Sequence, residues 1–166
     1  MSGTSGTRLL ALLALFIAAC AGSTPAPAPP SGHADRIAAI EAQITAAQNP
    51  DVGFVVFEDA SDKAKDGISR IVQLAGGATH IEVLCDAPHH QCEDSATQSL
   101  ITKLGFTPLN KYNGAYQKDD AKTTPHASAL LTEQLFLQVL KASPEYQLTY
   151  YNQVQQSPTP LPVKSG

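Results

Sequence analysis

The feature that most constrains this chain is a run of nine consecutive apolar residues near its start, from Leu9 to Ile17. As a helix this run would be about 14 Å long, and a bilayer core needs about 20 apolar residues. The run is therefore too short to span a membrane. One positive charge, Arg8, precedes it and small residues follow it, which is typical of a secretory signal peptide. We expect residues 1–19 to be such a signal peptide.

The exit of this segment reads Ile17-Ala18-Ala19-Cys20. It resembles the lipobox of bacterial lipoproteins, and the alternative is an ordinary signal peptide with a chance cysteine. The resemblance implies that the Cys20 thiol is diacylglycerylated, that cleavage precedes it and that the new amine is acylated. Several acyl chains anchor a protein durably where one does not. Ala21 follows in place of Asp, which in the enteric sorting rule implies the outer membrane, with the domain facing the periplasm.

A proline-rich linker follows the cysteine, because residues 21–31 read A-G-S-T-P-A-P-A-P-P-S. This composition favours a semi-extended chain, which at about 3.1 Å per residue would reach about 30 Å. We expect residues 20–34 to be a tether and residues 35–155 to be a single domain. Residues 156–166, which hold three prolines, are expected to be a disordered tail.

The composition fits one small domain and disfavours a nucleic-acid partner. The chain has 166 residues, of which 43% are apolar and 16% charged, enough for one core. Lys and Arg number 11 against 15 Asp and Glu, so the net charge is 11 − 15 = −4. A nucleic-acid-binding domain should present a basic face.

Hydrophobic periodicity predicts an alternation of helices and strands. The expected helices cover residues 35–48, 61–75, 93–104 and 126–142, and the expected strands cover residues 53–58, 80–85 and 109–117. In the last strand Asn113-Gly114 indicates either a hairpin or a kink, and an amphipathic stretch from Pro144 to Val154 follows the last helix. The predicted fold class is α/β (α+β), a small βαβ sandwich with a right-handed crossover and additional N- and C-terminal helices.

Three segments follow a known pattern: Val55-Val56-Phe57 with Ser61 and a helix, the strand Ile81 to Asp86, and the helix Ala96 to Phe106. They resemble the OmpA C-terminal-like domain, the peptidoglycan-binding fold of many envelope lipoproteins. The resemblance implies that an Asp and an Arg grip the charged ends of diaminopimelate. Asp86 lies at the Asp position, but Ala96 stands where the family has Arg. Without that charge-assisted bond, binding of diaminopimelate is expected to be weak or absent.

Cys85 and Cys92 are the two remaining cysteines once Cys20 is acylated. In an oxidising compartment such a pair indicates a disulfide. The alternatives are two free thiols or a redox-active pair, although the C-x6-C spacing is not the C-x-x-C of redox sites.

Histidines gather in the same region, where His80, His89 and His90 lie close to Cys92 in sequence. Imidazole and thiolate are ligands for zinc or copper, so a metal site or a small enzyme centred on these histidines is one alternative. The other is a polar loop, because the adjacent ligands His89 and His90 would strain a tetrahedral site.

Two further groups have plainer interpretations. The acidic residues Glu58, Asp59, Asp62 and Asp66 are expected at a solvated helix start, where the dipole favours negative charge. The aromatic segment from Tyr146 to Tyr151 is either a partner face or part of the core. No serine lies in a Gly-x-Ser-x-Gly elbow, and no cofactor is expected.

These observations predict a lipid-anchored periplasmic protein that is a non-enzymatic binding or structural module. Its expected partners are the lipid bilayer, through the acyl anchor, and either peptidoglycan or an envelope protein assembly. The alternative function is the metal-binding protein or small enzyme centred on His80, His89 and His90.

Overall fold

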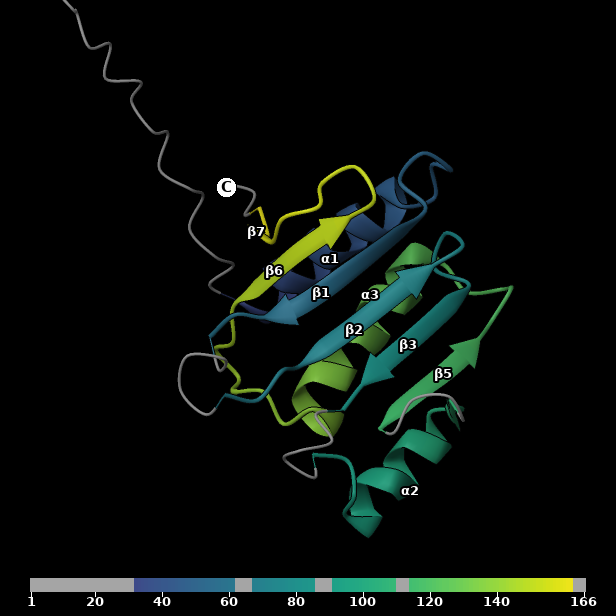
Figure 1. Ribbon diagram of the computed structural model, residues 1–166, viewed down its shortest axis with the longest axis vertical. Helices are drawn as coiled ribbons and strands as arrows, with labels where there is room; N and C mark the ends of the chain where they lie inside the picture. The colour runs from purple at the N-terminus through teal and green to yellow at the C-terminus, as the bar shows by residue number, and fades with distance from the viewer. Residues whose placement is uncertain (1–31, 62–66, 86–90, 110–113, 163–166) are drawn as a thin grey trace, which may run out of the picture.

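The computed structural model describes residues 32–61, 67–85, 91–109 and 114–162. They form a mixed α+β fold, which confirms the predicted class (Figure 1). The helices are α1 (His33–Ala46), α2 (Ser95–Lys103), α3 (Pro125–Gln134) and the π-helical turn η2 (Leu135–Val139). The strands are β1 (Phe54–Asp59), β2 (Ile71–Ala75), β3 (His80–Leu84), β4 (Thr107–Pro108), β5 (Ala115–Asp119), β6 (Leu148–Asn152) and β7 (Thr159–Pro160).

The strands pair into one antiparallel sheet in the order β4-β5-β3-β2-β1-β6-β7. In β1, β2 and β3 alternate side chains are buried on one face, because a strand points successive side chains to opposite sides. These core positions are Val55, Phe57, Val72, Leu74, Ile81 and Val83. α1 and α3 cover this face of the sheet and pack against each other (Figure 1).

The helix expected over residues 61–75 is wrong, because residues 71–75 form β2 and pair with β1 and β3 on either side. The predicted βαβ crossover is therefore also wrong. The helix that the OmpA-like resemblance implies at this place is likewise not found within described residues 67–75. Gly76 and Gly77, with φ of 60° and 68°, form the tight turn into β3, a conformation that glycine adopts at low cost.

The amphipathic stretch from Pro144 to Val154 contains a strand. Residues 148–152 form β6, which pairs with β1, and no helix occurs there among the described residues. The expected disordered tail is wrong in its first part, because Thr159 pairs with Tyr150 and the side chain of Leu161 is 0% exposed. The tail is held because it fills the edge of the sheet next to β6.

The other predicted elements are confirmed to within a few residues. α1 begins at His33, so residues 33 and 34 belong to the fold and not to the tether. Pairing of Pro108 with Tyr116 confirms the hairpin alternative for residues 109–117. α2 begins after Asp94, whose side chain accepts a hydrogen bond from the Thr97 amide at 2.8 Å. Among the described residues, no helix is both long and apolar enough to cross a bilayer.

Candidate functional site

The face of the sheet turned away from α1 and α3 is a broad surface that we call the open face, and it is turned toward the viewer in Figure 1. The strand registers place fourteen side chains on it: Phe54, Val56, Glu58, Ile71, Gln73, Ala75, His80, Glu82, Leu84, Ala115, Gln117, Asp119, Thr149 and Tyr151. Most are half-buried, and Val56 is only 1% exposed. Four of the polar members, His80, Glu82, Gln117 and Asp119, lie together on β3 and β5.

Both edges of the sheet end in very short strands. β4 and β7 have two residues each, and each contains a proline, Pro108 and Pro160. Proline cannot donate a hydrogen bond to a further strand, and short edge strands disfavour edge-to-edge pairing. The open face is therefore a better candidate contact surface than either edge.

The most polar part of the open face is centred on His80. Asp119 lies opposite His80 in the β3–β5 register, and its Oδ1 is 2.6 Å from the Nδ1 of His80. Glu82, two residues along β3, places its Oε1 2.9 Å from the Nε2 of the same ring. Hydrogen bonding to Glu82 and then to Asp119 raises the pKa of His80, with burial acting in the opposite direction. This arrangement holds an imidazolium between two carboxylates.

The metal-site expectation finds no geometric support around His80. Its two carboxylate partners bind opposite nitrogens of the ring, so their oxygens do not converge on one point. Over the described ranges, no group of three or more His, Cys, Asp or Glu side chains could hold a metal ion. His89, His90 and Asp86 lie outside the described residues. Ala96, the position where the OmpA-like pattern has Arg, is exposed on α2.

The predicted disulfide is confirmed, because Cys85 and Cys92 are bonded with their Cα atoms 5.8 Å apart. Both cysteines are buried, at 8% and 3% exposed. The bond joins the end of β3 to the segment that enters α2. The Cys85 amide also donates to the carbonyl of Gly114 at 2.9 Å, so this corner of the sheet is fixed from two sides.

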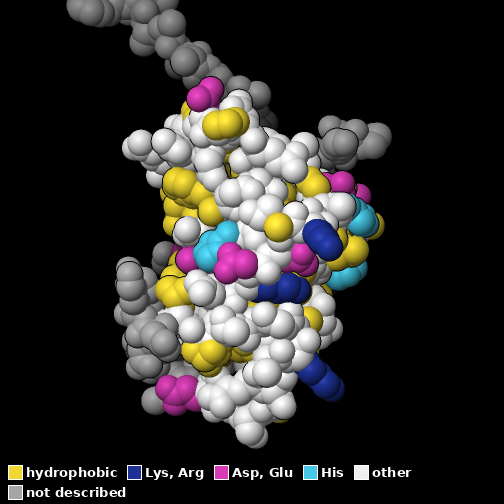
Figure 2. All heavy atoms as spheres, turned by 90° about the vertical axis from the view of Figure 1, so that its right-hand side faces the viewer, with side chains coloured by type: hydrophobic (Ala, Val, Ile, Leu, Met, Phe, Trp, Pro, Cys, Tyr) yellow, Lys and Arg dark blue, Asp and Glu magenta, His cyan; other side chains and the backbone are white. Residues whose placement is uncertain are grey.

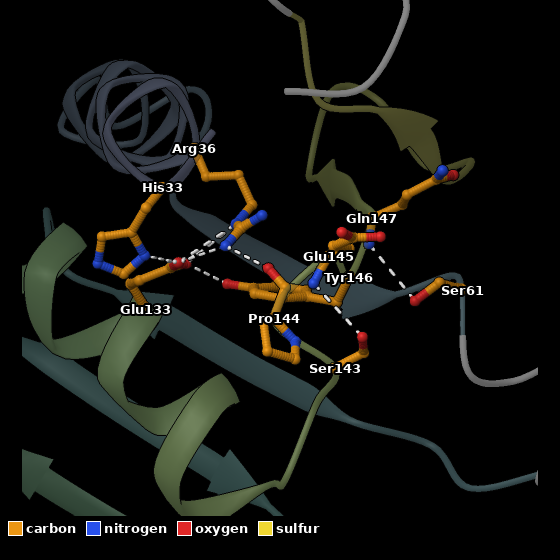
Figure 3. A network of polar contacts seen from close by, with 9 residues as sticks. All are labelled: His33, Arg36, Ser61, Glu133, Ser143, Pro144, Glu145, Tyr146 and Gln147. Carbon is orange, nitrogen blue, oxygen red and sulfur yellow. Dashed lines mark hydrogen bonds and ion pairs between the residues drawn. The ribbon is translucent and has the colours of Figure 1, made fainter. Parts of the chain in front are cut away.

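A second polar cluster lies inside the protein and was not predicted (Figure 3). Arg36 of α1 and Glu133 of α3 are 3% and 2% exposed, and the Nη2 of Arg36 donates to the Oε1 of Glu133 at 2.8 Å. Tyr146, 1% exposed, donates its hydroxyl to the other oxygen of Glu133. His33, in the first turn of α1, places its Nδ1 2.7 Å from Glu133 Oε1. We call Arg36, Glu133 and Tyr146 the buried cluster; His33, with its side chain 61% exposed, contacts it from the surface.

The end of α3 places the ring of Tyr146 in this cluster. The Leu140 amide donates to the Leu135 carbonyl at 2.8 Å, an i to i+5 bond that defines a π-turn. Phe136 in this turn stacks on Tyr146, with ring centroids 5.1 Å apart. The guanidinium carbon of Arg36 lies 4.4 Å from the centroid of the Tyr146 ring, close enough for a cation–π interaction.

Both carboxylate oxygens of Glu133 accept hydrogen bonds from other side chains of this region. Arg36 uses a further N–H on the carbonyl of Pro144 at 3.0 Å. Burial, and next the Glu133 carboxylate, raise the pKa of Tyr146, so its hydroxyl stays protonated. The hydrogen bond and charge of Glu133 raise the pKa of Arg36 against the opposing effect of burial. The cluster is thus a structural ion pair that joins α1, α3 and the approach to β6.

The sequence did contain a signal for this cluster. Arg36 lies four and eight residues before Ile40 and Ile44, and Glu133 lies four residues after Ala129. Each charge is therefore on the buried stripe of its helix. Since lone charges are almost never buried unpaired, a charge on a buried stripe indicates that it has a partner, although the sequence does not say which residue that is.

The remaining expectations divide between core and surface. The solvated helix start is wrong for Asp59, which is 0% exposed in β1 and accepts from the Ser61 amide at 2.9 Å. Tyr146 and Tyr150 pack in or against the core, whereas Tyr151 lies on the open face opposite Val56. The aromatic segment therefore contributes to both.

On the face of the molecule shown in Figure 2, charged and hydrophobic side chains are interspersed. Figure 2 shows acidic, basic and histidine side chains next to one another, with hydrophobic side chains between them. Among the described residues, the exposed large hydrophobic side chains are Leu130 and Val154, and neither is on the open face. A search against protein-family models, curated proteins and solved structures finds no match to this chain.

Proposed function

We propose that this chain is a lipid-anchored envelope protein, held at the outer membrane and facing the periplasm, whose α+β domain is a non-enzymatic binding or structural module. The lipobox at Cys20 and the proline-rich tether support this cellular location. The partner is the cell wall or an envelope protein assembly.

The observation that carries the proposal is the bond between Cys85 and Cys92. Structural disulfides form and persist in oxidising compartments and are rare in the cytosol. A buried disulfide in the domain and a lipobox before it favour the same location on independent grounds. The two features therefore support an extracytoplasmic, anchored protein together better than either does alone.

The open face is the binding surface in this proposal. α1 and α3 cover the other face of the sheet, and the proline-containing strands β4 and β7 protect its edges. A binding role is favoured over catalysis because the charges of the buried pair, Glu133 and Arg36, are bonded to each other. A general acid or base needs to reach a substrate proton, and these groups are 2% and 3% exposed.

The proposed lipid anchor and membrane location are tested with the variant Cys20→Ser in the native host. The wild-type chain should incorporate labelled palmitate and fractionate with the outer membrane. The variant should remain unlabelled and unprocessed, because lipidation of Cys20 precedes cleavage. A variant that is still processed and still membrane-bound would show that Cys20 is not the anchor.

The binding surface is tested by photo-crosslinking in cells, with the crosslinker at Gln73 on the open face. The matched control is Gln98, which is exposed on α2. We expect adducts from position 73 that exceed those from position 98 and that decrease in the Cys20→Ser background. Adducts that sediment with sacculi identify the cell wall, and discrete protein bands identify an assembly. Equal adducts at both positions would contradict the assignment of this face.

A further inference from the structure

The contact between His80 and Asp119 lies across the pairing that joins β5 to β3. β5 pairs with β3 over five register positions, from His80 opposite Asp119 to Leu84 opposite Ala115. On its other side β5 pairs only with the two residues of β4. β3 is thus the main support of β5, and the His80–Asp119 bond joins the two strands at the end of their ladder.

The hydrogen bonds at His80 require a particular number of protons. A carboxylate can only accept hydrogen bonds, and a neutral imidazole has one N–H. The Nδ1 of His80 is 2.6 Å from Asp119, and its Nε2 is 2.9 Å from Glu82. Both bonds can exist together only when both ring nitrogens carry a proton, so the observed geometry is that of the imidazolium.

The surroundings of His80 contain no other charged group that faces it from the described strands. On β2, the residue opposite His80 is Ala75, and the adjacent open-face residue is Gln73. Lys118 pairs with Ile81 and therefore points to the opposite face, as does Asp120 by strand alternation. Glu82 and Asp119 are the two charges that act directly on the ring.

We propose that His80 is a proton-dependent latch that holds β5 to β3 and sets the charge of the open face. With the proton in place, two carboxylates and one imidazolium carry one net negative charge. When the proton leaves, one ring nitrogen presents a lone pair to a carboxylate, that bond is lost, and the group carries two negative charges. Asp119 and Glu82 then compete for the one remaining ring N–H, so the cross-strand bond to Asp119 is made only part of the time and the β3–β5 pairing is weakened at that end. A periplasmic domain would experience this change directly with external pH.

The other described histidines provide an internal comparison. His126 of α3 bonds Glu41 of α1 through its Nδ1 at 2.8 Å, a single carboxylate that one N–H can satisfy. Its hydrogen bond therefore survives loss of the second proton. His126 is the matched control for His80, because it differs in having one carboxylate partner where His80 has two.

The latch is tested by NMR titration of the histidine side chains in the full chain, solubilised in detergent micelles. We expect the pH midpoint of the His80 titration to lie above 6.5, the pKa of an ordinary histidine. This midpoint should decrease in both Asp119→Asn and Glu82→Gln. The side-chain signals of His126, the control, should be the same in all three proteins at each pH. A His80 midpoint at or below 6.5, or one that neither variant moves, would overturn the proposal.

Hydrogen exchange tests whether the pairing of β5 with β3 weakens when His80 loses its proton. After correction for intrinsic rates, the β5 amides should lose protection as the pH rises through the His80 midpoint, while the β1 amides should not. His80→Gln keeps a side chain that can donate one hydrogen bond but cannot titrate, so its β5 protection should not change over the same range. If the change persists in His80→Gln, another group is the latch. Neither measurement depends on lipidation or on a partner, so failure here would leave the proposed function standing.

Discussion

Arg36 and Glu133, 97 residues apart in sequence, form an ion pair in which both side chains are almost completely removed from water. The pair connects the first turn of α1 to α3. Two N–H groups of Arg36 face Glu133 Oε1, at 3.2 and 2.8 Å. A buried pair of this kind contributes little net stability, but removal of one partner leaves an uncompensated charge in the core.

We therefore predict that Glu133→Ala or Arg36→Ala destabilises the domain by about 3–5 kcal/mol, the range for breaking a buried ion pair. The double variant Arg36→Met, Glu133→Leu should recover much of this loss, because no charge is then stranded. Urea unfolding followed by circular dichroism measures all three.

Glu41→Ala is the control, because its bond to His126 is exposed and exposed pairs contribute about 0–1 kcal/mol. If the single buried variants unfold at the same urea concentration as Glu41→Ala, the pair is not a structural element.

A second prediction concerns Tyr146 in alkali. Burial and the Glu133 carboxylate raise the pKa of its hydroxyl above that of an ordinary tyrosine. In the unfolded chain this tyrosine ionises near pH 10, so above that pH the folded state holds more protons than the unfolded state. The free energy of unfolding should then decrease as the pH rises further.

Tyr146→Phe keeps the ring but removes the titrating group, so its stability should decrease less steeply above pH 10. At neutral pH the same variant should be less stable by about 1–3 kcal/mol, because a buried oxygen of Glu133 loses a hydrogen bond. If the free energy of unfolding decreased equally steeply above pH 10 in the wild type and in Tyr146→Phe, Tyr146 would not be the titrating group.

The elements that the sequence predicted well are those whose signals are local. α1, α2 and α3 combine helical periodicity with end signals, such as Asp94 before α2 and Pro125 at the start of α3. The disulfide followed from the compartment and from the number of cysteines. None of these inferences required knowledge of distant contacts.

β2 shows why other elements were missed. Ile68, Ile71, Val72 and Ala75 fit helical spacing, yet the same segment alternates in burial at Val72 and Leu74. A short apolar run satisfies both periods, and the choice is made by β1 and β3, which need a partner between them. Likewise the Arg36–Glu133 bond spans most of the domain, so the sequence could indicate two buried charges but not that they meet.

The third prediction concerns the disulfide. The bond between Cys85 and Cys92 closes a loop with a sequence separation of 7, and loop entropy assigns such a closure about 2–3 kcal/mol. Cys85→Ser, Cys92→Ser should lower the free energy of unfolding by this amount, and reduction of the wild type should have a similar effect. Peptide mapping without reductant should give the two cysteines as a linked pair. Two freely alkylated thiols in periplasm-derived protein would contradict this.

The final prediction concerns the C-terminal segment, which composition alone assigned to a disordered tail. Leu161 is 0% exposed in the core, and its amide donates to the carbonyl of Leu148 at 3.0 Å. Leu161→Ala removes buried methyl groups and leaves a cavity, so it should cost about 2–5 kcal/mol. Pro162→Ala, at an exposed neighbouring position, is the matched control and should change stability by less than about 0.5 kcal/mol. Truncation after residue 155 should be at least as destabilising as Leu161→Ala, because it removes β7 together with the leucine. If the truncated and full chains unfold at the same urea concentration, residues 156–162 are not part of the fold.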